Sequence, residues 1–328
     1  MQPGRADVTH FGTDGSFQLM NASTLDTIKT SAAVPSVPQV VLRFLEVLRD
    51  PSFDYGELVK TLSSDPGTVS EVLRLANSPL FGARQRIVSL RQALTLLGPK
   101  RTRSLLLGRY LVDTMSRKRV QGVDMGYFWR RSLACGVVAA RLADTALPQY
   151  REESFIAGLL ADVGIPILAE AAPDAYGEIA SQFTANKPTV PAIQEHYAVG
   201  ATHAEVSAMV LKHWSLPDLI CTAVNLHQSD NPGPSDEGSL ARLLNASDRI
   251  AKLVCEVPDT AVAAAECTQA MSFVGAPIEV LVKLLGTVQI DIEGMAQNLR
   301  ITVLPGHVYG LIAQSLQQAF DPAQTSPA

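Results

Sequence analysis

Apolar side chains recur at the spacing of amphipathic helices almost everywhere between residues 25 and 320. Val41, Phe44 and Leu45, for example, follow the i, i+3, i+4 pattern that places side chains on one face of a helix. We find no run of alternating apolar and polar residues bounded by hairpin turns, and strand-like pieces such as 300–304 are short. The pattern therefore predicts an all-α fold.

Start and stop signals divide this pattern into separate helices. Asp65 is a predicted N-cap, because it precedes a proline and an apolar periodic run. Ser89 is expected to open a further helix that Gly98 closes. Asp54 and Glu57 have the spacing of a capping box, which predicts another helix start.

The helices fall into successive parts of the chain. We expect a flexible tail, an N-terminal helical part, a second helical part, C-terminal helices and another flexible tail at residues 1–24, 25–120, 121–258, 259–320 and 321–328. The link at 120–124 is short, so the two larger parts are expected to share one core. Two helices are expected between Ala276 and Phe320.

Composition limits the class of protein. Of 328 residues, 47% are hydrophobic and 18% are charged, which excludes a disordered chain and a coiled coil. The four cysteines lack C-x-x-C spacing and are expected to be buried thiols. The apolar stretch 155–172 contains Asp162, Pro166 and Glu170, which favours two buried helical segments with a turn over a membrane span. Residues 1–21 lack the apolar core of a signal peptide, so we expect a soluble, cytoplasmic protein.

Positive charge is concentrated in one part of the chain. Between residues 84 and 119 there are ten basic residues and one acidic residue, Asp113, although the whole chain carries a net charge of −5. Such a run is either a solvated helical face or a docking face for an anionic partner. The candidate docking residues are Arg84, Arg86, Arg91, Lys100, Arg101, Arg103 and Arg109.

Several short motifs occur in a fixed order. They are V-P at 37–38, S-D-P at 64–66, V-L-R-L-A-N-S at 72–78, I-V-S-L-R-Q-A-L at 87–94, L-G at 97–98, F-W at 128–129, A-G-L-L-A-D-V-G at 157–164, Glu195, His203, W-S-L-P at 214–217 and His227. Together they resemble the HDOD domain over about residues 30 to 230. The resemblance implies a bacterial, helical signalling or regulatory module that is similar to the HD and HD-GYP phosphohydrolases but has lost metal ligands. It also implies an HD-like part at 121–258 and a partner that acts in trans.

The resemblance further implies a remnant of a metal pocket. An HD phosphohydrolase needs a histidine on the helix after the Trp, an adjacent His-Asp pair and a distant Asp, and two histidines are added in two-metal variants. The matching positions here are Arg131, Ala161, Asp162, Asp248, His203 and His227, and the second histidine of the last pair is Gln228. Because Arg131 and Ala161 replace two ligands, we expect no metal, no cofactor and no hydrolase activity.

Each of these residues also has a simpler interpretation. His203 and His227 could be hydrogen-bonded core residues, and Asp162 could cap a helix before Gly164. A more specific hypothesis gives Arg131 a structural role, as the bidentate partner of Asp162 or of a second buried carboxylate, Asp248.

The leading hypothesis is a non-catalytic adaptor, a pseudoenzyme that binds a signalling protein or, as a lesser candidate, a nucleotide. One alternative is a DNA-binding regulator that uses the helices between Asp65 and Thr114 together with the basic stretch 84–119. Another is a residual metal-dependent phosphodiesterase. No membrane partner is expected.

Overall fold

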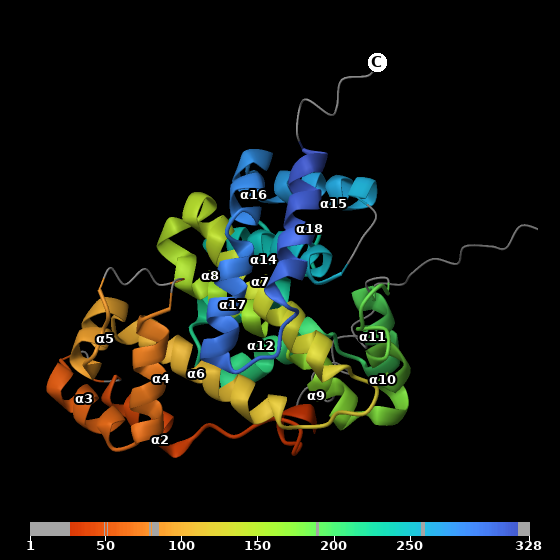
Figure 1. Cartoon of the computed structure of the whole chain (residues 1–328). Coiled ribbons are helices and arrows are strands. Elements are labelled where there is room, and N and C mark those ends of the chain that lie inside the picture. Colours follow the sequence, from red (N-terminus) through yellow and green to blue (C-terminus); the bar gives the residue numbers. More distant parts are fainter. Residues whose placement is uncertain are drawn as a thin grey trace, which may run out of the picture.

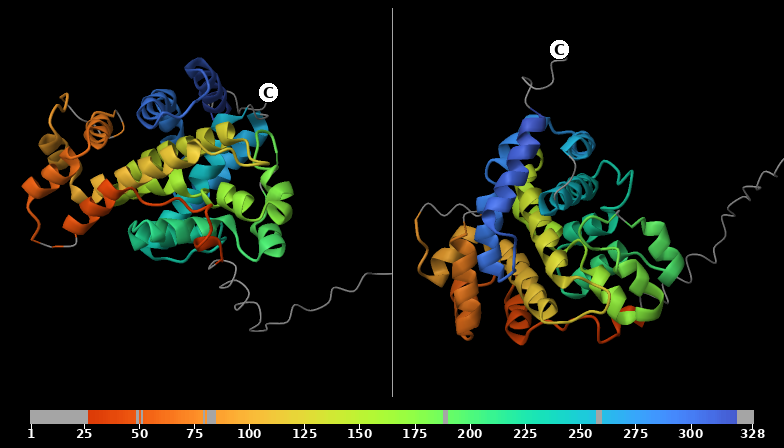
Figure 2. Two further views of the ribbon diagram at one scale, coloured as in Figure 1. Left: turned by 90° about the horizontal axis from the view of Figure 1, so that it is seen from below. Right: turned by 45° about the vertical axis from the view of Figure 1, so that its right-hand side comes forward.

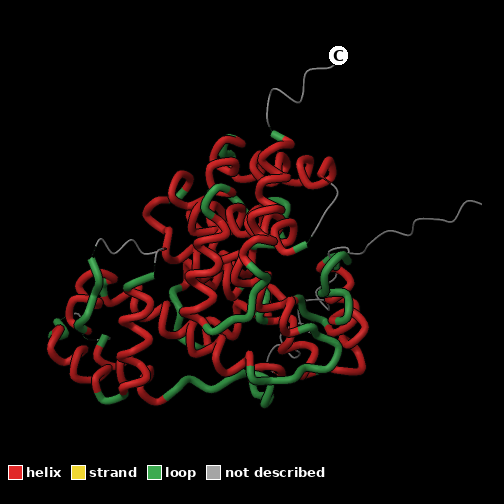
Figure 3. The backbone as a smooth tube through the Cα atoms, in the orientation of Figure 1, coloured by secondary structure: helices red, strands yellow, loops and turns green. Residues whose placement is uncertain are grey.

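The computed structural model describes residues 27–48, 50, 52–78, 80, 85–187, 190–256 and 260–320. These residues form helices joined by turns and loops, with no strand among them (Figure 3). The all-α prediction is therefore confirmed. The two predicted tails, 1–24 and 321–328, lie outside the described residues.

The N-terminal part contains α2 (Gln39–Val47), α3 (Tyr55–Ser63), α4 (Pro66–Ala76), α5 (Leu90–Leu97) and α6 (Pro99–Ser116). The Asp65 side chain accepts hydrogen bonds from the first turn of α4, and Ser89 does the same for α5. Gly98 has a φ of 74° and ends α5, as predicted. The capping box at Asp54 was wrong, because the first turn of α3 is held by the Asp54 carbonyl oxygen and not by its side chain.

The second part is built around one long buried helix, α7 (Met125–Ala146), which lies at the centre of the molecule (Figure 1). The short 3-10 turn η2 (Pro148–Tyr150) leads to α8 (Arg151–Leu160), which packs closely on α7. The two helices approach so closely that a Cβ atom on Gly136 would lie only 2.8 Å from the Phe155 carbonyl oxygen. Glycine at this position therefore allows the two helix backbones to approach each other.

The predicted pair of segments at 155–172 is confirmed as α8, a turn at 161–163 and α9 (Gly164–Ala171). By length and composition, 148–171 is apolar enough to cross a membrane, but 83% of its most apolar window is buried inside the protein. The bent pair 261–274 and 278–285 passes the same test together. A core helix with this degree of burial meets the criterion without any membrane.

The remaining helices of this part surround α7, α8 and α9. They are α10 (Pro173–Ala180), α11 (Ala192–Val199), α12 (His203–His213), α13 (Asp218–Leu226) and α14 (Asp236–Cys255). Gly164 begins α9 where that helix meets α12, and a Cβ on Gly164 would lie 2.1 Å from the His203 carbonyl oxygen. The close approach of these two helices brings the 161–163 turn to the first residue of α12.

The C-terminal part differs from the prediction. Three helices, α16 (Ile278–Leu285), α17 (Val288–Leu299) and α18 (Gly306–Ala319), follow α15 (Thr260–Val274), where two were expected between Ala276 and Phe320. The pattern is interrupted at Gly286 and Thr287, which form a turn that redirects the chain. Residues 301–304, which look strand-like in the sequence, have no regular secondary structure.

Helix α17 connects the parts of the molecule. It packs on α7 and also contacts α4 and α6, as its position between them in Figure 1 and Figure 2 shows. Two side-chain contacts mark this role: Arg141 on α7 donates to Asp291 at 2.7 and 2.5 Å, and the Ser78 hydroxyl lies 2.9 Å from Met295 Sδ. The buried apolar residues, from Ile28 to Leu316, form one contiguous cluster.

Candidate functional site

Five of the six residues of the remnant pocket carry polar side chains, and the fold brings them together. Arg131 comes from α7, Asp162 from the 161–163 turn, His203 from the start of α12, His227 from the end of α13 and Asp248 from α14. All five are buried. Ala161 is buried in the same turn and offers only a methyl group. The fold therefore brings the predicted residues together, and their contacts divide them into two groups.

The first group is an ion pair between Arg131 and Asp248. The Arg131 guanidinium donates from Nε to Asp248 Oδ1 at 3.0 Å and from Nη2 to Oδ2 at 2.6 Å. Burial alone would lower the pKa of Arg131, but the charges of Asp248 and Asp162 hold it above its ordinary value. The guanidinium is therefore a fixed positive charge in a fork-like contact with Asp248, one of the two partners that the sequence predicts.

The second group is Asp162, His203 and His227. Asp162 Oδ1 lies 3.5 Å from His203 Nε2 and 3.3 Å from His227 Nε2. The three candidate ligand atoms all lie within 4.8 Å of one another. Asp162 does not cap α9, because that helix has Val163 at its N-cap and no side-chain cap. The capping interpretation of Asp162 was therefore wrong, and its carboxylate faces the two imidazoles instead.

A hydrogen-bond partner at Nδ1 fixes the orientation of each imidazole. His203 Nδ1 lies 2.7 Å from Glu195 Oε2, which also accepts the His203 backbone N–H at 3.0 Å. Tyr176 binds the other oxygen of Glu195. His227 Nδ1 lies 2.6 Å from the Val224 carbonyl oxygen, so this nitrogen carries the proton in the neutral ring. In both rings it is Nε2 that faces Asp162.

Sequence reasoning gave no role to Glu195 or Tyr176. Glu195 is fully buried on α11, a short helix that is separated from α12 by a turn at the left-handed Gly200, whose φ is 71°. No helical spacing therefore relates Glu195 to His203 along the chain. For the same reason His196, on α11, and His203, on α12, do not share a helix.

The charges in this group are strongly coupled. Burial would raise the pKa of Asp162, but hydrogen bonding and charge from His203, with further contributions from His227 and Arg131, hold it well below its ordinary value. Burial would lower the pKa of His203, but Glu195 and Asp162 raise it to about 10. In the metal-free protein His203 is therefore a buried imidazolium between two carboxylates.

A cavity of about 550 Å³ opens beside this site, on the side of Asp248. Gln228, Asn245, Arg249, Lys252 and Glu256 are among the residues that line it. Neither Asp162 nor the two histidines line it. Of the residues of the remnant pocket, only Asp248 would therefore contact a molecule in this cavity.

The basic stretch does not form one continuous surface. Arg86, Arg91 and Lys100 are exposed. Arg101 is half-buried and pairs with Glu152 at 3.2 Å. Arg103 is also half-buried, and burial lowers its pKa.

The structure excludes Arg109 from any docking face, because Arg109 is buried. It lies 3.4 Å from Glu71 and 3.3 Å from Asp113. The sequence could not show this, because α6 is covered on most sides and its two faces differ little in hydrophobicity. Arg84, which was predicted for the same face, lies outside the described residues.

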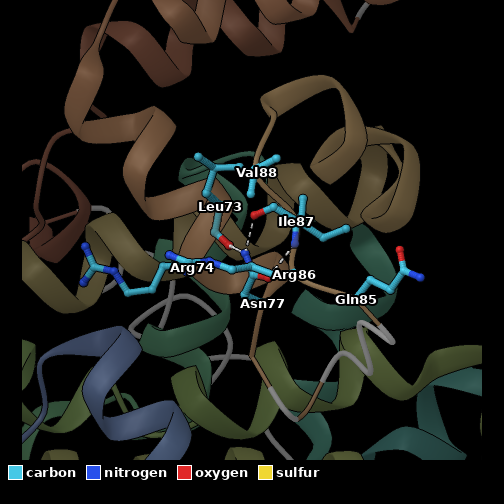
Figure 4. A pocket seen from close by; sticks show the side chains of 7 residues that line it. All are labelled: Leu73, Arg74, Asn77, Gln85, Arg86, Ile87 and Val88. Atoms are coloured by element: carbon cyan, nitrogen blue, oxygen red, sulfur yellow. Dashed lines mark hydrogen bonds between the residues drawn. The ribbon is translucent and has the colours of Figure 1, made fainter.

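A groove of about 770 Å³ lies beside the exposed part of this stretch (Figure 4). Asn77 holds its wall together: its side-chain amide donates to the Leu73 and Ile87 carbonyl oxygens at 2.7 and 2.8 Å and accepts the Ile87 N–H at 2.8 Å. Asn77 of the A-N-S motif therefore links the segment 86–88 to the end of α4. Val88 in this segment is 70% exposed, the largest exposed fraction among the large apolar side chains described.

Comparison with known proteins relates this arrangement to one family. The family model of the HDOD domain matches residues 34–230. A curated relative, an uncharacterized protein of Treponema pallidum (strain Nichols), is 24% identical over 208 residues, which is 62% of this chain. The chain spans 39% of that relative's length.

Solved structures share the fold at low sequence identity. An HDOD domain protein with unknown function from Geobacter sulfurreducens matches with a TM-score of 0.62 at 20% identity, covering 86% of this chain and 98% of the other. The "Putative phosphohydrolase" from Shewanella amazonensis SB2B matches with 0.58 at 20% identity, covering 88% and 99%. The "Putative signal transduction protein" from Marinobacter aquaeolei VT8 matches with 0.58 at 20% identity, covering 86% and 66%.

Proposed function

The chain belongs to the HDOD domain family, and from this premise we propose that it is a non-catalytic signalling adaptor of the bacterial cytoplasm that binds a protein partner in trans. A signalling role is supported by the family and by the signal transduction protein that shares the fold. The single observation that carries the non-catalytic part is the bidentate Arg131–Asp248 pair.

Phosphoester hydrolysis of the HD type uses carboxylates and imidazoles to hold ions that activate water. Here the Asp248 carboxylate has both oxygens engaged by a guanidinium, and Ala161 replaces a ligand by a methyl group. A permanent positive charge at Arg131 repels a cation from the same oxygens. The geometry therefore favours binding over hydrolysis.

We assign partner binding to the surface that carries Arg86, Arg91 and Lys100 together with the groove beside Val88. The three basic side chains are exposed, and two hydrogen bonds between the Asn77 amide and the Ile87 backbone hold the 86–88 segment in place. Arg86 lines the groove together with the exposed Val88, and positive charge beside an exposed apolar side chain fits a protein partner with an acidic rim. Arg101, Arg103 and Arg109 are not part of this surface, because they are paired or withdrawn from solvent.

The test is a quantitative pull-down with the full chain, followed by mass spectrometry. The variant Arg86→Glu, Arg91→Glu, Lys100→Glu is compared with the control Lys60→Glu, Lys212→Glu, Lys283→Glu, which reverses the same number of exposed charges elsewhere. Each exposed substitution should change the folding free energy by about 0.5 kcal/mol or less. We expect the first variant to lose the partners that the wild type and the control capture. Equal capture by both variants would contradict the assignment of the surface.

Two further measurements address the rival functions. For DNA binding, filter-binding titrations at two salt concentrations should show weak retention of DNA, with an affinity that depends little on salt. A steep salt dependence that the Arg86→Glu, Arg91→Glu, Lys100→Glu variant abolishes would favour the DNA-binding regulator. For a phosphodiesterase, turnover of cyclic dinucleotides and of a chromogenic phosphodiester with Mn²⁺ should not exceed that of the Asp162→Asn variant. Turnover that depends on Asp162 would overturn the non-catalytic proposal.

A further inference from the structure

We infer that Asp162, His203 and His227 bind one divalent transition-metal ion of the Zn²⁺ type, as a buried structural site that carries out no hydrolysis. This inference does not depend on the partner surface or on the adaptor role. The sequence-based expectation of no metal rested on positions 131 and 161, and neither of them supplies any of these three ligand atoms. The three residues come from the 161–163 turn, the start of α12 and the end of α13.

The distances fit tetrahedral coordination. Zn²⁺ bonds of about 2.1 Å to nitrogen and oxygen, at tetrahedral angles, place neighbouring ligand atoms about 3.4 Å apart. Asp162 Oδ1 lies 3.5 Å from His203 Nε2 and 3.3 Å from His227 Nε2. The two imidazole nitrogens lie within 4.8 Å of each other. A small closing movement of the imidazoles would complete one triangular face of a tetrahedron.

The histidines are oriented as metal ligands require. Glu195 receives His203 Nδ1 at 2.7 Å, and the Val224 carbonyl oxygen receives His227 Nδ1 at 2.6 Å. A carboxylate or carbonyl behind the ring fixes the tautomer and directs the Nε2 lone pair toward the metal. Gln228 Nε2 lies 2.9 Å from His227 Nε2, which agrees with a lone pair on that nitrogen. Rotation of this amide would present its oxygen as a fourth ligand.

The contacts at the centre of the site are long. Asp162 Oδ1 is buried, and the Nε2 atoms of His203 and His227 that face it lie 3.5 and 3.3 Å away, farther than in an ordinary charge-assisted hydrogen bond. A buried carboxylate oxygen that its neighbours satisfy this poorly is costly. The Arg131 charge is balanced by Asp248, which leaves the carboxylates of Asp162 and Glu195. A dication bound between the two imidazoles would balance both carboxylates.

The position of the site assigns it a structural role. Asp162, His203 and His227 are all buried, and none of them lines the neighbouring cavity of about 550 Å³. A catalytic ion needs an open position that substrate can reach. Here the ion would instead join three segments of the HD-like part, and its binding free energy would add to the stability of the fold.

The experiment uses the full chain after removal of metal with EDTA. We expect it to take up one Zn²⁺ per chain, and Co²⁺ to give the intense visible absorption of a tetrahedral site. With free Zn²⁺ at 100 times its dissociation constant, the unfolding equilibrium constant should fall about 100-fold. The Glu195→Gln variant, which changes only the group behind His203, should bind Zn²⁺ about 10–100-fold more weakly.

Matched variants test the ligands themselves. Asp162→Asn and His203→Gln should abolish Zn²⁺ uptake, whereas Asp174→Asn and His213→Gln, at exposed positions on α10 and α12, should retain it. Zn²⁺ uptake that survives both ligand substitutions would overturn the inference, as would no uptake by the wild type. If a ligand variant does not fold by circular dichroism, X-ray absorption of the Zn²⁺-loaded wild type decides. Two imidazole ligands support the site, and none or one excludes it.

Discussion

Replacing Arg131 offers the most direct test of how the pocket is held together. The guanidinium makes two charged hydrogen bonds to Asp248, at 3.0 and 2.6 Å, and the two side chains are only 10% and 9% exposed. The substitution Arg131→Met keeps an apolar stem in place but leaves the Asp248 carboxylate buried without its partner. Removing one member of a buried ion pair costs about 3–5 kcal/mol.

This free energy can be converted to a melting temperature. At about 2.1 cal/mol/K per residue, unfolding of the 328-residue chain has an entropy of about 0.7 kcal/mol/K. The expected fall in Tm is therefore about 4–7 °C. Differential scanning calorimetry gives this shift, and urea titration followed by circular dichroism gives the change in the free energy of unfolding.

The double variant Arg131→Met, Asp248→Asn separates pairing from packing. Replacing both charges removes the unpaired carboxylate, so the double variant should recover most of the stability lost by Arg131→Met alone. The matched control is Arg130→Met, which changes the neighbouring, half-buried arginine. If the effects of Arg131→Met and Asp248→Asn simply add, or if Arg131→Met leaves Tm unchanged, the pair does not hold the pocket together.

Three further predictions concern other parts of the fold. Asn77→Ala should cost about 1–2 kcal/mol and should speed hydrogen exchange at the Ile87 amide, because the clamp on the 86–88 segment is lost; unchanged exchange there would contradict the clamp. Arg141→Met should lower stability by about 3–5 kcal/mol in urea titrations, since Asp291 on α17 is 3% exposed and loses its bidentate partner, and Asp291→Asn in the same chain should restore much of it. The four cysteines are buried, and burial raises the pKa of their thiols, to about 11 for Cys221. Ellman's reagent at pH 8 should therefore label the native protein slowly, and should label all four thiols after unfolding. Rapid labelling of the native protein would contradict this prediction.

The site shows where reasoning from sequence succeeds. Arg131 was predicted to contact a buried carboxylate because a buried charge needs a partner, and Asp248 was one of two candidates. The structure selects Asp248, because Asp162 faces the imidazoles of His203 and His227. The choice between the two carboxylates depends on which helices meet, and no local pattern contains that information.

The amino-acid sequence by itself determined the helical class, the helix boundaries at Asp65, Ser89 and Gly98, and the two-segment form of 155–172. These features depend on residues within a few positions of one another, through side-chain caps, backbone freedom and apolar spacing. The resemblance carried by the motifs extended this to the family and to the members of the remnant pocket.

Only the tertiary structure decided which charged residues are withdrawn from solvent and which side chains share a site. Arg109 is buried on α6, on which both α4 and α8 pack. Glu195 reaches His203 because α11 and α12 turn at Gly200. Burial and contact between distant segments depend on how whole helices pack, so the metal-ligand geometry at Asp162 arises only once the helices are assembled.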